Sequence, residues 1–169
     1  RPLASDWSVL PWGRFVEWAG NSVRLGGITA ALAVAISFAL AFAVRRSRDA
    51  VTRAVVRLAS LGYAVPGAVI VVGLLLPVGW VQAAAPTLAL PALITATAVG
   101  IVWAYLVRFC AVALQSVQSG YARIPMSLDD SSRMLGVGGV RLLSRVHWPL
   151  LKRSAAAAAL LVFVDVMKE

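Results

Sequence analysis

The chain has 169 residues, of which 60% are hydrophobic and 14% charged, and its mean hydropathy is +0.84. Soluble domains are typically about half apolar and about a quarter charged, so this composition excludes an ordinary soluble domain and favours a protein of the lipid bilayer. The formal net charge of +9 would suit nucleic-acid binding. The placement of the charges, described below, argues against that class.

Residues 1–20 are rich in tryptophan and precede the first long apolar run. Trp7, Pro11, Phe15 and Trp18 recur at helical spacing, although Pro11 interrupts it, and this pattern is compatible with a segment lying in the outer headgroup zone of a membrane. A disordered end is the alternative. The chain starts at Arg1 without Met or a signal sequence, so we expect it to be a piece of a longer protein.

Three apolar runs, residues 21–44, 58–80 and 88–107, are long enough to cross a bilayer, which takes about 20 helical residues. A fourth run begins near Pro149 and covers residues 150–169. The first run carries two stripes of small residues that would let helices approach closely, Gly26, Ala30 and Ala33, and Gly27, Ala31 and Ala35. These runs predict an all-α, polytopic transmembrane helical bundle in which residues 21–169 form one domain.

The second run is interrupted by Pro66 and Gly67, where the missing N–H and the proline ring must kink or break a helix. With Tyr63 beside it, this break is a candidate gate or pathway wall, and a simple packing kink is the alternative. Arg108 follows the third run directly. We expect its side chain to extend to lipid phosphates at the membrane surface.

Basic residues occupy two of the connecting segments. One group lies between the first and second runs (Arg45, Arg46, Arg48, Arg53, Arg57), and the other follows the third run (Arg123, Arg133, Arg141, Arg145, Lys152, Arg153). The link at residues 81–87 has no charge. Short loops rich in Lys and Arg stay cytoplasmic, which places segments 45–57 and 127–149 inside and the N-terminus and residue 81 outside.

Cys110 and His147 are the only cysteine and histidine, which excludes an intrachain disulfide and a zinc site built from several such residues. The chain also lacks the GxxxxGK[ST] loop that cradles ATP phosphates. We therefore expect no catalytic residue, no bound metal and no cofactor in this chain. If ATP drives it, another subunit holds the ATP and Mg.

Residues 127–149 predict two short helices joined by a glycine bend. Ser127 and Asp130 form an S-x-x-D capping pattern, so the first helix should start at Leu128 and end at Gly136. Gly138 and Gly139 allow a tight turn before a second helix at residues 140–147. That helix should place Val140, Leu143 and Val146 on one side and Arg141 and Arg145 on the other, with Pro149 in the first turn of the fourth span.

The same segment resembles the EAA-x3-G-x9-I-x-LP loop of permease subunits of ATP-binding-cassette (ABC) importers, which have the MetI-like fold. Asp130-Ser131-Ser132, Gly136 and Val146-His147-Trp148-Pro149 match its spacing, with Asp for Glu, Ser for Ala and Trp for Leu. Residues 161–169, with Ala64-Val65-Pro66-Gly67 upstream, are similar to the iron(III) branch of these binding-protein-dependent permeases.

The resemblance implies a bacterial inner-membrane permease that works with an ATP-binding subunit, an external substrate-binding protein and a second permease half. It further implies that the loop docks on the ATP-binding subunit through residues that share one segment: Ser127, Leu128, Asp129, Asp130, Ser131, Ser132, Arg133, Met134, Leu135, Gly136, Val137, Arg141, Arg145 and Pro149. The alternatives are a polyamine or thiamine permease, a membrane anchor or assembly protein without transport, and a secondary transporter.

Asp165, Lys168 and Glu169 place three charges within an apolar run. Asp165 lies twelve residues after Arg153, roughly 18 Å along a helix and near the middle of the hydrocarbon. Charges at such a depth usually face the bundle interior and mark a pathway. Asp165 and Glu169 share a helix face and are therefore candidates to meet a cation, and a hydrated vestibule or a structural pairing is the alternative.

Overall fold

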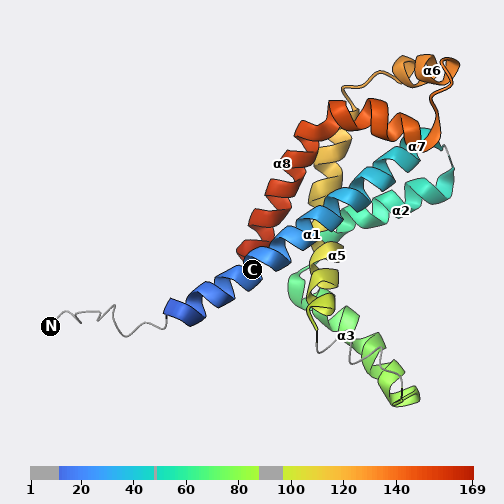
Figure 1. Ribbon diagram of the computed structural model, residues 1–169. Helices are drawn as coiled ribbons and strands as arrows, with labels where there is room; N and C mark the ends of the chain where they lie inside the picture. Colours follow the sequence, from blue (N-terminus) through green and yellow to red (C-terminus); the bar gives the residue numbers. More distant parts are fainter. Residues whose placement is uncertain (1–11, 48, 88–96) are drawn as a thin grey trace.

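The computed structural model describes residues 12–47, 49–87 and 97–169, and within these ranges it contains helices and no strands (Figure 1). The elements in chain order are α1 (Trp12–Arg46), α2 (Ala50–Leu61), the short 3₁₀ helix η2 (Gly62–Ala64), α3 (Gly67–Ala84), α5 (Ala98–Tyr121), α6 (Met126–Met134), α7 (Gly139–Leu142), the π-helical turn η3 (Leu143–His147) and α8 (Trp148–Met167). The predicted all-α fold is confirmed.

Three of the described helices, α1, α3 and α5, are long and apolar enough to cross a membrane. Helix α8 forms over 20 residues where the fourth span is predicted. It carries Lys152, Arg153 and Asp165 and is not among those three, so its crossing stays a prediction. Arg48, the first nine residues of the predicted third span and most of the predicted interfacial segment, Trp7 and Pro11 included, lie outside the described residues.

Helices α1, α5 and α8 pack on one another and enclose the core (Figure 1). Small and branched side chains fill it, among them Ala33 of α1, Leu114 and Val117 of α5, and Ala158 and Val162 of α8. The first predicted stripe, Gly26, Ala30 and Ala33, is buried here, whereas Gly27, Ala31 and Ala35 face outward. Among the described residues, one face of α1 therefore packs on the other helices and the opposite face is exposed.

Gly120, near the end of α5, lets α5 and α8 approach each other closely. A Cβ added at Gly120 would lie 2.5 Å from Oγ of Ser154 and 2.8 Å from Cδ2 of Leu151. Nearby, the hydroxyl of Ser116 donates to the carbonyl of Ser154 at 3.3 Å. The close contact brings the start of α8 against the end of α5. The segment between these two helices, which contains α6, α7 and η3, is therefore held at both of its ends.

The predicted second span, residues 58–80, is interrupted, and the break predicted at Pro66 and Gly67 is confirmed. Helix α2 ends at Leu61, η2 follows, and α3 begins at Gly67 with Pro66 as its N-cap residue. The break falls where the sequence places it, because Pro66 has no N–H and holds its own φ at −57°. Gly62 lies so close to α5 that an added Cβ would overlap the carbonyl oxygen of Val107.

The helix that carries the predicted third span extends beyond residue 107, the predicted end of that span. Helix α5 continues to Tyr121, because the residues after Arg108 still supply a buried face that includes Phe109, Leu114 and Val117. Arg108 therefore lies inside the helix rather than past its end. Its side chain, predicted to extend to lipid phosphates, instead contacts Glu169 and Phe109 within the protein, as described below.

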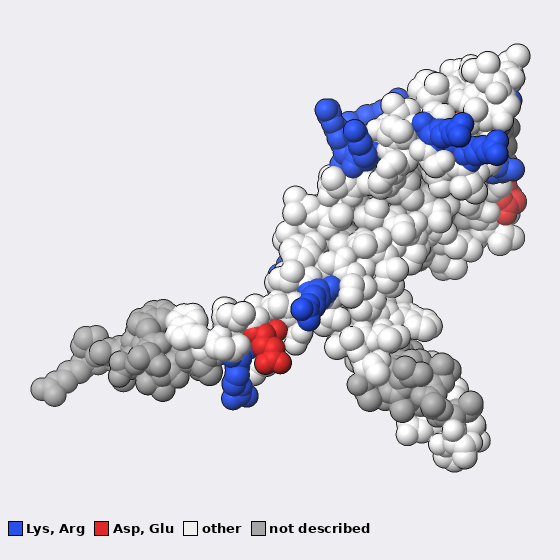
Figure 2. Space-filling model, viewed as in Figure 1, with Lys and Arg blue, Asp and Glu red and all other residues white. Residues whose placement is uncertain are grey.

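The two predicted cytoplasmic segments meet at one end of the molecule. The end of α1, the start of α2, and α6 and α7 lie together there, while α3 ends at the opposite end (Figure 1). On the face seen in Figure 2, most of the blue Lys and Arg side chains gather over the α6 and α7 end. We call this the basic end.

Candidate functional site

Helix α6 at the basic end starts at Met126, two residues before the predicted start. Its N-cap is Pro125, without a side-chain cap, and the carbonyl of Pro125 accepts the N–H of Leu128 at 3.2 Å. Ser127 lies inside the helix, where its carbonyl accepts the hydroxyl of Ser131 at 2.8 Å. The prediction that Ser127 and Asp130 cap this helix is therefore wrong, because the helix already begins at Met126, with the extended residue Pro125 as its N-cap.

The predicted bend at Gly136 is confirmed. Gly136 adopts φ +76°, the left-handed conformation that costs little only for glycine, and its N–H donates to the carbonyl of Arg133 at 2.9 Å. The N–H of Val137 then donates to the carbonyl of Ser132 at 2.9 Å, which closes the end of α6. Gly139 is also left-handed, at φ +58°, and turns the chain into α7.

The predicted second helix forms, but it runs without a break through α7 and η3 into α8. Its inner side is partly different from the prediction: Leu142 and His147 are buried, while Val140 is exposed. Arg141 and Arg145 face outward as predicted, and Pro149 lies in the first turn of α8 as predicted.

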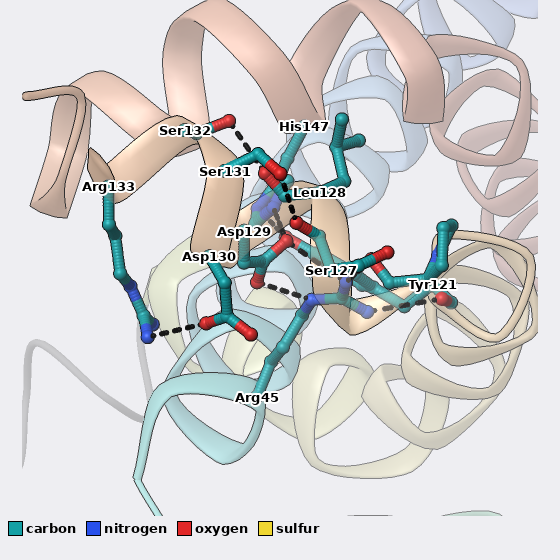
Figure 3. Close-up of polar contacts among 11 residues, drawn as sticks. Arg45, Tyr121, Ser127, Leu128, Asp129, Asp130, Ser131, Ser132, Arg133 and His147 are labelled. Atoms are coloured by element: carbon teal, nitrogen blue, oxygen red, sulfur yellow. Dashed lines mark hydrogen bonds and ion pairs between the residues drawn. The ribbon is translucent and has the colours of Figure 1, made fainter. Parts of the chain in front are cut away.

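Asp129, predicted to face a partner, lies inside the molecule and pairs with Arg45 of α1 (Figure 3). Nε of Arg45 donates to Oδ2 at 2.8 Å and Nη2 donates to Oδ1 at 3.0 Å, so the guanidinium holds both carboxylate oxygens. Nη2 also donates to the carbonyl of Pro125 at 3.0 Å. The side chains of Arg45 and Asp129 are 10% and 3% exposed, which makes this a buried, two-point ion pair.

His147 and Tyr121 extend this pair into a network of four residues. Nε2 of His147 lies 3.1 Å from Oδ1 of Asp129, and Nδ1 lies 3.2 Å from the hydroxyl of Tyr121. The ionised carboxylate can only accept, so Nε2 of His147 donates to it, while Nδ1 lies within hydrogen-bond distance of the Tyr121 hydroxyl. We call Arg45, Tyr121, Asp129 and His147 the polar clamp.

The charge state of Asp129 follows from these contacts. Burial acts to raise the pKa of its carboxyl, but the hydrogen bonds from Arg45 and His147 and the positive charge of Arg45 outweigh burial, so the pKa is lowered. Asp129 is therefore a carboxylate at neutral pH. The clamp joins the ends of α1 and α5 with α6 and with η3, which leads into α8, through the Arg45–Asp129 ion pair and the hydrogen bonds of His147.

The outer surface of α6 and its bend carries the remaining predicted interface residues. Met134, Leu135 and Val140 are 90%, 83% and 77% exposed. Asp130 and Arg133 form an exposed pair at 3.5 Å, and Arg46, Arg133, Gly138 and Gly139 line an open hollow of about 400 Å³. Ser127 and Ser131 are exposed, Leu128 and Val137 are half-buried, and Ser132 is buried like Asp129.

Two of the predicted pathway residues, Gly67 and Glu169, lie against Arg108. Nη1 of Arg108 lies 2.9 Å from Oε2 of Glu169, and its guanidinium lies over the ring of Phe109, 5.3 Å from the centroid. A Cβ added at Gly67 would lie 2.6 Å from Nη1 of Arg108, so α3 begins directly against this pair. Arg108 thus connects the helix break with the end of α8.

Asp165 and Glu169 do not share a partner, because Asp165 pairs with Lys168 and Glu169 pairs with Arg108. Tyr63 is exposed, and its ring lies tilted against that of Phe109, with the ring centroids 6.5 Å apart. Within the described ranges no group of three or more His, Cys, Asp or Glu side chains lies close enough to hold a metal ion.

Sequence reasoning missed Arg45, Tyr121 and His147 as partners of α6. The sequence held a signal for His147, because a histidine buried in an apolar, helical context needs a polar partner. No sequence pattern connects Arg45 to Asp129, since 84 residues separate them.

The profiles of known protein families give no match to this chain. The chain is 29% identical over 150 residues to "Putative ABC transporter permease protein ORF1" of Streptomyces antibioticus, a match that covers 88% of this chain and 60% of that protein. The chain thus spans about three fifths of the length of the curated relative it matches. In its described residues the chain is helical without strands and has three helices long and apolar enough to cross a membrane, and the chain is similar to a protein named as a putative ABC transporter permease.

Proposed function

We propose that this chain is part of the transmembrane permease of an ATP-driven importer and that α6 with the Gly136 bend docks on an ATP-binding subunit. The single observation that carries the proposal is the exposed apolar tip formed by Met134, Leu135 and Val140. Large apolar side chains that project from a bend into water mark a contact surface. The loop spacing and the permease relative support the same conclusion.

The proposed orientation places the basic end in the cytoplasm of a bacterial inner membrane. Both Arg-rich segments lie at that end, as the positive-inside tendency requires of segments on the same side. ATP and Mg would be bound by the partner subunit, and this chain would carry out no chemistry. An external substrate-binding protein and a second permease half complete the proposed importer.

We propose iron(III) as the substrate, on the similarity of residues 161–169 and 64–67 to iron(III) permeases. Asp165 and Glu169 are each paired with a cationic side chain, so a passing metal would have to displace Lys168 or Arg108. In this proposal the carboxylates of the pathway are neutralised by Lys168 and Arg108 while no metal is bound. The external binding protein selects iron(III) over other substrates.

The docking proposal is tested by copurification of the full permease with its ATP-binding subunit. Met134→Glu combined with Leu135→Glu should abolish copurification, because two charges would be buried against an apolar partner surface. Val51→Glu is the matched control, since Val51 is 71% exposed in the first turn of α2 at the same end. Retention of the ATP-binding subunit by the double variant would contradict docking through this tip.

The substrate proposal has its own test. Cells that depend on this importer should lose uptake of radioactive iron(III) when the gene is deleted and should keep uptake of putrescine and thiamine. Normal iron(III) uptake in the deletion strain would overturn the assignment. Loss of putrescine or thiamine uptake instead would identify one of the alternative substrates.

A further inference from the structure

Helix α6 is attached to the rest of the molecule by few contacts. In Figure 1 it stands at the edge of the structure, and the chain enters and leaves it through non-helical segments. Of its nine residues, only Asp129 and Ser132 are buried. The hydroxyl of Ser132 donates to Leu128 within α6 itself, at 2.8 Å. Leu128 adds an apolar contact with the core.

Asp129 is therefore the α6 side chain whose described hydrogen bonds reach other elements. Its partners occupy the ends of two long helices of the core: Arg45 is one residue from the end of α1, and His147 directly precedes α8. These two helices also pack on each other along their length. Asp129 is thus bonded both to the end of α1 and to the residue that precedes α8.

We propose that Asp129 is the positioning residue through which movement of α6 is carried to α1 and α8. This inference rests on the proposed docking of α6 on an ATP-binding subunit. The apolar contact of Leu128 has no preferred direction and would let α6 slide or rotate. The two-point ion pair with Arg45 fixes both distance and orientation, and breaking it would leave a buried charge without a partner. The pair therefore holds while α6 is pushed.

Distances between spin labels test whether Asp129 fixes α6 to α1. Labels are placed on cysteines at Met126, the first residue of α6, and at Ala39, on the outward face of α1, with Cys110→Ala as the background. The full permease is reconstituted in nanodiscs with its ATP-binding subunit. With native Asp129 we expect one narrow distance distribution that ATP leaves unchanged, because α6 and the end of α1 move together.

Asp129→Asn keeps the size of the side chain and removes its charge. We expect a broadened distribution that shifts on addition of ATP, retained binding of the ATP-binding subunit, and more ATP hydrolysed per iron(III) ion taken up. Arg45→Lys, which keeps the charge but loses the two-point geometry, should change in the same direction. Asp49→Asn is the control: it makes the same change at the N-cap of α2, where Asn caps as well as Asp.

A narrow distribution unaffected by ATP in both Asp129→Asn and Arg45→Lys, or a native ratio of hydrolysis to uptake, would overturn the inference. If Asp129→Asn does not fold, Arg45→Lys alone decides. If the native permease binds no ATP-binding subunit, the proposed function fails, whereas the distances measured without ATP still decide whether Asp129 fixes α6.

Discussion

The guanidinium of Arg45 and the carboxylate of Asp129 meet at 2.8 and 3.0 Å across a sequence separation of 84 residues, at 10% and 3% side-chain exposure. A buried pair of this kind contributes little net stability relative to an apolar pair of similar shape, but losing one partner is costly. The contact therefore acts mainly as a specific connection between the first long helix and α6.

Asp129→Ala should lower the free energy of unfolding by about 3–5 kcal/mol, because it leaves Arg45 charged and unpaired in a buried site. Unfolding of the purified permease in detergent, followed by circular dichroism with denaturant, measures this change. Asp130→Ala removes an acid from the same helix, but Asp130 pairs with Arg133 at the surface, so its cost should stay below about 1 kcal/mol. Equal costs for the two variants would contradict the buried pair.

The clamp also predicts how stability depends on pH. Arg45 and His147 lower the pKa of Asp129 below 3.8 in the folded chain, so the unfolded chain binds this proton more readily. The stabilisation is present above pH 3.8 and is lost as the pH falls through the lowered value. The stability difference between the native chain and Asp129→Asn should therefore be constant near neutral pH and shrink below about pH 4.

Asp49 titrates in the same acidic range and must be separated from Asp129. Hydrogen bonds from the side chains of Ser47 and Thr52 and from the backbone of Thr52 lower the pKa of Asp49 to about 2. The comparison is therefore made in an Asp49→Asn background. A stability difference that stays constant down to pH 2 in that background would contradict the assignment to Asp129.

Gly136→Ala should destabilise the chain by about 1–2 kcal/mol, because a side chain is unfavourable in the left-handed conformation at φ +76°. Gly138→Ala is the matched control, since Gly138 has φ −135° and open space around it. The denaturant midpoints of the two variants, measured under the same conditions, give the stability change of each. If Gly138→Ala is the more damaging change, the bend does not depend on the conformation of Gly136.

Glu169→Gln should reduce assembly of the permease, because it leaves Arg108 charged among apolar side chains, at a cost of about 2–3 kcal/mol. Adding Arg108→Gln should restore assembly, since both charges are then absent. Size-exclusion chromatography of membrane-extracted protein measures the assembled fraction. Restored assembly without uptake would give Arg108 and Glu169 a role in the pathway, whereas a double variant worse than Glu169→Gln would contradict the pairing.

Orientation is tested with single cysteines at two exposed positions, Gln82 at the end of α3 and Arg53 in α2. An impermeant thiol reagent added to intact cells should label Gln82→Cys and not Arg53→Cys, because Arg-rich segments stay cytoplasmic. Both should be labelled after the membrane is permeabilised. The opposite pattern in intact cells would reverse the proposed topology.

Local chemistry in the sequence determined the helical class, the break at Pro66 and the bend at Gly136. Each follows from the residues on the spot: apolar runs long enough for a bilayer, a proline without an N–H, and a glycine that tolerates positive φ. The inward stripe of Gly26, Ala30 and Ala33 was also readable, but the sequence alone did not distinguish it from the outward stripe of Gly27, Ala31 and Ala35.

Only the tertiary structure decided which charges meet. Asp129 and Asp130 are neighbours of the same chemical type, yet one is buried against Arg45 and the other pairs at the surface with Arg133. The same holds for Arg108, which the close contact of α5 with Gly67 turns toward Glu169 instead of toward lipid. The side on which a helical residue lies depends on the neighbouring helices. Those contacts join residues far apart in the chain, and no local pattern encodes them.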